Sequence, residues 1–165
     1  MGKRVKLKAG DIFRFHGNGK LTGIGQVIEP GGVLYATILR PDFSDLADIG
    51  GLPTEDILFC GWTMDALFYH DQWHVIGNLP IPEGSIPRPC SKVQIGGEIW
   101  VQDFRARPLR RANSAEAATL DNHTSRSPKT YVDAYNAHHG LGEWLPRYES
   151  FSIERVRKLA AICSG

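Results

Sequence analysis

The fold is decided by the stretch AGDIFRFHGNG at residues 9–19. Phe13 and Phe15 stand two residues apart, so they share one face of a strand, and the asparagine and glycine that follow supply the positive φ angles of a tight turn. A second stretch, DQWHVIG at residues 71–77, shows the same two-residue alternation, which places Trp73 and Val75 on one apolar face and predicts that Trp73 is largely buried. Both patterns predict short antiparallel strands joined by glycine-rich hairpins, which are typical of small β-barrels and strongly bent sheets.

Apolar runs bounded by glycine and proline continue this pattern over the first hundred residues. Four prolines between residues 80 and 89 predict an extended connector, and residues 42–53 predict a long loop with at most one helical turn. In chain order, we expect strands at 11–15, 21–28, 33–39, 57–59, 66–69 and 72–76, and a hairpin over 91–104.

Helix signals replace strand signals in the last third of the chain. Residues 113–116 have the spacing of a capping box, and residues 127–128 place a proline in a first helical turn. After Ser152, apolar residues recur every three or four positions, which predicts a final helix.

A chain of 165 residues is long enough to bury one sizeable core as a single domain. We expect a mainly β, α+β fold. Its β-rich part is a strongly bent antiparallel sheet or SH3-like barrel over residues 5–104, and residues 105–165 form a helical extension of the same domain, packed against it.

The charges are nearly balanced, with 19 Lys and Arg against 18 Asp and Glu, so no global field favours nucleic acid or a membrane surface. Cys60, Cys90 and Cys163 are an odd number at no metal-like spacing, which favours reduced thiols in a cytoplasm. No apolar run approaches the ~20 residues of a membrane span, and the lysine-rich start lacks the apolar segment of an export signal. We expect a soluble cytoplasmic protein.

No residue pattern indicates catalysis. His70 and His74 lie on a predicted strand, where positions four apart are ~13 Å from each other, and residues 138–139 are better explained as a helix end. Cys60 has apolar neighbours, and Ser85 lacks the nucleophile-elbow glycines. Four glycines between residues 17 and 25 do not match a phosphate-binding loop, and we interpret them as hairpin glycines. We therefore expect no enzyme activity, metal or cofactor.

Two charged segments are candidates for binding. The arginine run at residues 105–111, near Trp100 and Phe104, would suit single-stranded nucleic acid. The favoured interpretation is a solvated linker whose charge balances the acidic segment at residues 42–56. The acidic segment is either an ordinary polar surface or a docking face for a basic partner. Aromatic residues nearby are either interface anchors or core residues. The candidate partner-binding residues are Asp42, Asp45, Asp48, Glu55, Asp56, Trp62 and Tyr69.

The opening at residues 10–15, the strand at 25–28, and residues 72–77 leading into Pro80 together resemble the immunity protein 26 family of bacterial polymorphic toxin systems. The resemblance covers residues 8–90, about half of the chain. It implies a cytoplasmic protein that binds a cognate protein toxin and neutralises it by occlusion, with no catalytic residues of its own. If that toxin acts on an anionic substrate, its cleft is basic and the acidic segment should face it.

Two alternatives remain open. The same kind of barrel occurs in PemK-type ribonuclease toxins, for which Arg14, Thr37 and Arg40 would be the expected basic and hydroxyl groups. A nucleic-acid-binding module would instead use the arginine run. The sequence leaves the oligomeric state open.

Overall fold

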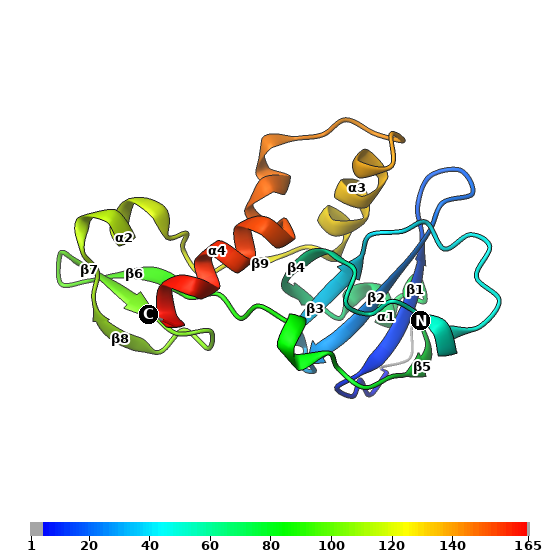
Figure 1. The fold of residues 1–165 in the computed structure, drawn as a ribbon, viewed down its shortest axis with the longest axis horizontal. Helices are drawn as coiled ribbons and strands as arrows, with labels where there is room; N and C mark the ends of the chain where they lie inside the picture. Colours follow the sequence, from blue (N-terminus) through cyan, green and yellow to red (C-terminus); the bar gives the residue numbers. More distant parts are fainter. Residues whose placement is uncertain (1–4, 165) are drawn as a thin grey trace.

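The protein is an α+β fold with a six-stranded and a three-stranded sheet, and the computed structural model describes residues 5–164 (Figure 1). The strands are β1 (Asp11–His16), β2 (Thr22–Glu29), β3 (Val33–Leu39), β4 (Ile57–Met64), β5 (His74–Asn78), β6 (Ser91–Ile95), β7 (Glu98–Gln102), β8 (Pro108–Arg111) and β9 (Ser125–Arg126). The helices are α1 (Ala66–Tyr69), α2 (Ser114–Thr119), α3 (Pro128–His138) and α4 (Ile153–Ser164), and the 3-10 turns are η1 (Ile49–Gly51), η2 (Glu83–Ser85) and η3 (Pro146–Phe151).

The six-stranded sheet has the order β5-β1-β2-β3-β4-β9. Its strands are antiparallel to their neighbours, except that the short β9 runs parallel to β4. Because β5 and β9 form two separate edges, the sheet is open. The bent-sheet form of the expectation therefore fits better than the closed barrel, which the structure does not confirm.

Both faces of this sheet are buried. Successive side chains of a strand point to opposite faces, and the central strands carry apolar residues on both. Phe13 and Phe15 of β1 face one cluster, and Ile12, which precedes them, faces another. On β2, Gly25 lies opposite Phe13 and Gly23 opposite Phe15, and a Cβ at either glycine would collide with the ring across from it. These two glycines are strand residues that make room for an aromatic pair, so their interpretation as hairpin glycines was wrong.

The first cluster, called here the helix-side cluster, lies between the sheet, α3 and η3. Tyr131 and Tyr135 of α3 pack with Phe151 of η3 against the phenylalanines of β1 and β4. Trp73 stacks on Phe13 with ring centroids 4.6 Å apart, and only 3% of it is exposed, which confirms its predicted burial. It lies one residue before β5, whereas Val75, expected on the same buried face, is 39% exposed.

The opposite face carries the loop-side cluster, which loops and the start of α4 cover. The proline-rich connector between β5 and β6 crosses this face, placing Ile86 in the cluster and accepting a 2.6 Å hydrogen bond from the Tyr35 hydroxyl at Pro87. The first turns of α4 add Ile153 and Val156. The connector thus runs from one edge of the sheet toward the other, as an extended segment with one 3-10 turn.

The three-stranded sheet, β6-β7-β8, lies at the far end of the molecule from β5, with α2 beside it (Figure 1). Helix α4 joins the two ends. Val156 near its start lies in the loop-side cluster, and Leu159 lies in a third cluster with Cys90, Val101 and Leu120. The small sheet is therefore attached to the large one through a shared helix rather than through a continuous sheet.

Most expected elements are confirmed, but three regions differ. Residues 66–69, expected as a strand, form the short helix α1, which places Phe68 edge-on to both Phe13 and Trp73. The strand expected at 57–59 continues to Met64. The expected boundary after residue 104 falls inside the small sheet, because β8 follows it and pairs with β7. Among residues 5–164 there is no helix with the length and apolar character needed to cross a bilayer.

Candidate partner-binding surface

The most distinctive surface is the acidic loop, residues 41–56, which connects β3 to β4. Its apolar side chains recur at every third position. Phe43, Leu46 and Leu52 pack into the loop-side cluster, and Ile49 fills the space left open by Gly77 of β5. A side chain at position 77 would collide with Ile49. The loop is therefore fixed across the face of the sheet by four apolar contacts.

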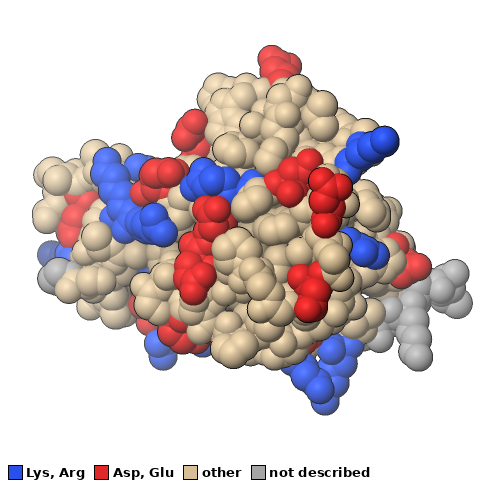
Figure 2. Space-filling view, turned by 45° about the vertical axis from the view of Figure 1, so that its right-hand side comes forward, with Lys and Arg blue, Asp and Glu red and all other residues tan. Residues whose placement is uncertain are grey.

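The carboxylates stand between these anchors. Asp42, Asp45 and Asp48 each precede an anchor, and all three are exposed. Because every third residue is an anchor, the aspartates that precede the anchors are carried on the outer side of the loop. In Figure 2, which brings the right-hand side of Figure 1 forward, carboxylates lie among uncharged groups over the middle of the face, and basic side chains are more scattered.

Two of these aspartates shape the loop backbone. Asp42 accepts hydrogen bonds from the backbone N–H groups of Ser44 at 2.9 Å and Thr22 at 3.3 Å. Slight desolvation works to raise the pKa of Asp42, but these hydrogen bonds outweigh it, so the pKa lies below its usual value. Asp48 accepts from the N–H of Gly50 at 3.2 Å and caps the turn η1. These hydrogen bonds hold both carboxylates in defined positions.

The start of the loop is tied to the body of the protein. The Tyr135 hydroxyl lies 2.6 Å from the carbonyl oxygen of Pro41 and 3.0 Å from that of Thr22, and His139 is hydrogen-bonded to the carbonyl oxygen of Arg40. Burial, together with the nearby Asp42 carboxylate, raises the pKa of Tyr135 above its usual value. Helix α3 therefore fixes the point at which the acidic loop leaves the sheet.

Most carboxylates of the acidic loop form no ion pair within the described residues. Among the described residues, the loop makes one ion pair, from Asp56 to Arg40 at 3.2 Å. Arg40 also approaches Glu154 of α4 at 4.0 Å. The remaining loop carboxylates, which are Asp42, Asp45, Asp48 and Glu55, form no ion pair within residues 5–164.

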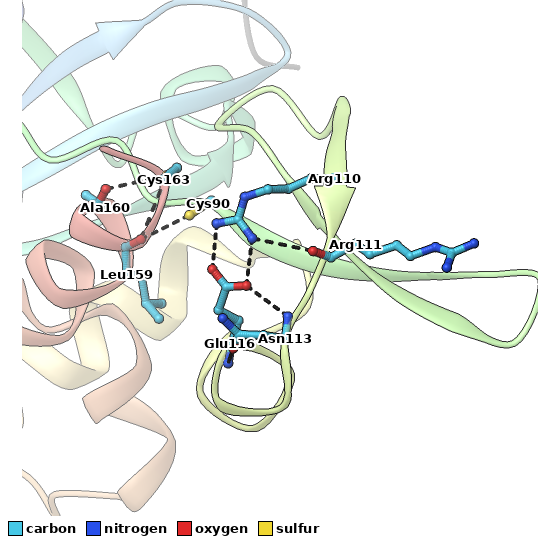
Figure 3. A network of polar contacts seen from close by, with 8 residues as sticks. All are labelled: Cys90, Arg110, Arg111, Asn113, Glu116, Leu159, Ala160 and Cys163. Atoms are coloured by element: carbon cyan, nitrogen blue, oxygen red, sulfur yellow. Dashed lines mark hydrogen bonds and ion pairs between the residues drawn. The ribbon is translucent and has the colours of Figure 1, made fainter. Parts of the chain in front are cut away.

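The arginine run differs from the acidic loop in this respect, because each of its arginines is paired with a carboxylate. Arg110 makes a bidentate contact with Glu116 at 2.7 and 2.6 Å, visible in Figure 3, where the two side chains point toward each other. The other pairs are Arg105 with Glu29 at 2.9 Å, Arg107 with Asp103 at 2.8 Å, and Arg111 with Glu98 at 2.9 Å. These arginines make ion pairs on their own protein, which disfavours the nucleic-acid interpretation.

The two aromatic candidates lie outside the acidic loop. Trp62 is half-buried between Tyr35 and Phe104, with ring centroids 5.2 and 4.8 Å away, and it packs against the loop-side cluster, as the apolar anchors of the loop do. Tyr69 is the last residue of α1, and Phe68 before it belongs to the helix-side cluster on the opposite face of the sheet. The five acidic residues therefore lie on one loop, and Trp62 shares their side of the sheet.

The groups expected of a ribonuclease are not assembled either. Thr37 is fully buried in the centre of the sheet, Arg40 is paired with Asp56, and Arg14 is exposed on β1. These three residues therefore do not line one open cleft.

A small cavity of about 60 Å³ lies where the two sheets meet, and Cys60, Trp62, His123 and Arg126 are among the residues that line it. This volume corresponds to about two water molecules, whereas pockets for small-molecule ligands typically measure about 300–1,000 Å³. Within residues 5–164, no three His, Cys, Asp or Glu side chains are grouped in a way that could hold a metal ion. Two more open grooves are larger, about 410 Å³ beside Gly31 and Asp65 and about 650 Å³ beside Ser85 and Arg157. The choice of the acidic loop as the candidate surface therefore rests on its carboxylates that form no ion pair within the described residues, and not on pocket size.

The sequence pattern that would have revealed the loop's construction is a repeat of three residues, DFSDLADI at positions 42–49. It places an aspartate before three of the four apolar anchors, Phe43, Leu46 and Ile49. The aspartates were identified from the sequence, but the period was not. One partner of the arginine run could not have been identified from a local pattern, because Glu29 is 76 residues away from Arg105 in the chain. Asp103 and Glu116, by contrast, lie four and six residues from their arginines.

Comparison with other proteins does not add to this picture, since the chain matches no known family, no functionally described protein and no solved structure.

Proposed function

We propose that this protein is an immunity protein that binds a cognate bacterial toxin through the acidic loop and neutralises it by occlusion. The observation that carries the proposal is the contrast between the two charged segments. Four carboxylates of the acidic loop are free of ion pairs within the described residues, whereas the arginine run is neutralised internally. The resemblance of residues 8–90 to the immunity protein 26 family points to the same function.

The construction of the loop suits rapid association with a basic surface. Exposed carboxylates steer a positively charged partner toward them, which raises the association rate at low ionic strength. The four apolar anchors and the contacts of Tyr135 fix the loop backbone, so less conformational entropy is lost on binding. Occlusion needs only surface complementarity, and a typical stable interface buries roughly 1,600 Å² in total.

The partner that fits this surface is a protein toxin with a basic active-site cleft, such as one that acts on a nucleic acid or a nucleotide. The loop would cover the cleft with its carboxylates and compete with the phosphate groups of the substrate. The interface would then centre on Asp42, Asp45 and Asp48, with Glu55 and Asp56 at its margin.

The test is co-expression in bacterial cells with the toxin encoded by the neighbouring gene. We expect this chain to restore growth and to co-elute with the toxin in size-exclusion chromatography. A variant carrying Asp42→Asn, Asp45→Asn and Asp48→Asn should protect less well, while an equally expressed Glu143→Gln variant should protect fully. Failure of the unmodified chain to bind the toxin or to restore growth would overturn the proposal.

A further inference from the structure

Two of the three cysteines meet at the far end of α4. Cys90 lies just before β6, and Cys163 lies in the last turn of α4. Both thiols approach the same carbonyl oxygen, that of Leu159, at 3.1 Å from Cys90 and 3.9 Å from Cys163 (Figure 3). Cys163 also lies 3.4 Å from the carbonyl oxygen of Ala160. Because both distances end at the carbonyl oxygen of Leu159, the two sulphur atoms can be no farther apart than these two distances added together.

The surroundings of the two thiols differ. Cys90 is 2% exposed within the third cluster, whereas Cys163 is partly exposed to solvent. Burial, followed by the hydrogen bond and the charge of Cys163, raises the pKa of Cys90 to about 12. The third cysteine, Cys60, is buried on β4 beside Tyr35 and lines the same small cavity as Cys90, but within residues 5–164 it shares no hydrogen-bond acceptor with either of the other two thiols.

We propose that Cys90 and Cys163 form an intrachain disulfide when the protein meets a disulfide oxidant such as oxidised glutathione. The structure holds all three cysteines as free thiols, so the bond would be a response to oxidation rather than a permanent part of the fold. This inference goes beyond the proposed toxin binding and does not depend on it.

The chemistry proceeds by two exchange steps. The thiolate of Cys163, which is accessible, attacks one sulphur of oxidised glutathione, and one glutathione leaves as a thiolate and takes up a proton. Cys90 then loses its proton to solvent and attacks the Cys163 sulphur, forming the intrachain bond and releasing the second glutathione. Two cysteine thiols are oxidised, and one glutathione disulfide is reduced to two thiols.

The position of Cys163 makes the closure feasible. A disulfide requires the two Cα atoms to lie about 4.4–6.8 Å apart, and the last turn of a helix can shift by a residue or two because helix ends fray. The bond would tie the end of α4 to the segment that opens the small sheet, closing a long loop in the chain. Restricting the unfolded chain in this way should stabilise the folded state.

The full-length protein, incubated with oxidised glutathione at pH 8, tests the proposal. After denaturation and alkylation with iodoacetamide, mass spectrometry of the proteolytic fragments should find Cys90 joined to Cys163 and Cys60 alkylated. Dithiothreitol should restore three alkylated cysteines. The oxidised form should also melt at a higher temperature than the reduced form.

Three variants make the result specific. Cys60→Ser should form the bond as the wild type does, and Cys163→Ser should form none. Cys90→Ser keeps a hydroxyl that can donate to Leu159, and in this variant Cys163 should remain as a mixed disulfide with glutathione. The proposal fails if the wild type also stops at that mixed disulfide, if Cys163 joins two chains, or if Cys60 takes part.

Discussion

Single residues set the packing of the large sheet, and Gly25 is the clearest case. A Cβ at this position would collide with the ring of Phe13 on β1 and with the carbonyl oxygen of Thr37 on β3. We expect Gly25→Ala to lower the free energy of unfolding by about 1–3 kcal/mol, as overpacking of a core does. Urea denaturation measures this loss. Gly32→Ala is the matched control because no atom lies within 4 Å of the position of its Cβ, and an equal loss there would contradict the explanation.

Trp73 is the second residue with a measurable contribution. It stacks on Phe13 and meets Phe68 edge-on, and it is almost fully buried. Truncation of a buried tryptophan typically costs ~3–5 kcal/mol, so Trp73→Ala should lose that much in a denaturation curve. Trp144, which is 38% exposed, provides the comparison, and Trp144→Ala should lose much less. If the two variants lost similar amounts, the placement of Trp73 in the core would be wrong.

Residue-scale features could be predicted only where the signal is local. The two-residue spacing of Phe13 and Phe15 indicates a strand with both rings on one face, and the structure confirms it. The role of Gly25 was not predictable, because it depends on which residue of β1 lies opposite, and strand register is a long-range property.

At the scale of elements, helix α2 is held at its start by charge. Asn113 and Glu116 form a reciprocal capping box, as their spacing predicts, and Arg110 adds an ion pair. The hydrogen bonds from the Arg110 guanidinium and then from the Asn113 backbone lower the pKa of Glu116 to about 2. A carboxylate whose pKa is lower in the folded state stabilises the fold above its ordinary pKa and loses this effect as the pH falls.

Glu116→Gln tests this contribution, because glutamine keeps the capping hydrogen bond and removes the charge. We expect the variant to be less stable than the wild type at pH 7, with the difference shrinking between about pH 4.5 and pH 2. Urea unfolding across this range measures it. A difference that stays constant with pH would show that the charge of Glu116 is not responsible.

The acidic loop is the element through which we propose that the protein binds a toxin. Asn at positions 42, 45 and 48 keeps the side-chain acceptors that Asp42 and Asp48 use and removes three charges. We expect this triple variant to bind the cognate toxin with a slower association rate at low salt, and the difference from wild type should narrow as salt is raised. Surface plasmon resonance over a salt series measures this. Equal association rates at low salt would remove the acidic loop from the interface.

Whether a segment forms a helix or a strand was predictable where the periodic pattern of apolar residues was long enough. Helices α3 and α4 begin and end close to the expected residues, because capping signals and an apolar stripe agree. Residues 66–69 are a short apolar run, which is compatible with strand or helix, and the packing of Phe68 against Trp73 decides for the helix. The strand β9 has two polar residues and therefore no apolar pattern that could have revealed it.

At the scale of the whole molecule, α4 couples the two sheets. Its apolar residues lie in the loop-side cluster and in the third cluster, so we expect the sheets to unfold together. Cys60 in the large sheet and Cys90 beside the small sheet are buried thiols. The reactivity of each thiol therefore reports the unfolding of the sheet in which or beside which it lies. In a Cys163→Ser background, both should become reactive toward iodoacetamide at the same urea concentration. Leu159→Ala should expose Cys90 first, and coincident exposure in that variant would mean that α4 does not couple them.

The overall arrangement was the least predictable feature. The sequence predicts most of the strands but contains no signal for an open sheet rather than a closed barrel, because closure depends on whether the edge strands meet. Here the return of the chain at β9 fills the edge beside β4, while β5 forms the other edge. Other long-range contacts place Leu159 against Cys90 and Arg105 beside Glu29.

The three-residue repeat of the acidic loop assigns anchoring and solvent exposure to different positions of one segment. Phe43, Leu46 and Ile49 hold the backbone, and the residues before them face outward without contributing to the core. Specificity for a partner can therefore change through substitutions at the outward positions while the scaffold beneath them stays the same. In a lineage of competing strains, such a loop would let recognition diverge quickly, because a new partner requires no new fold.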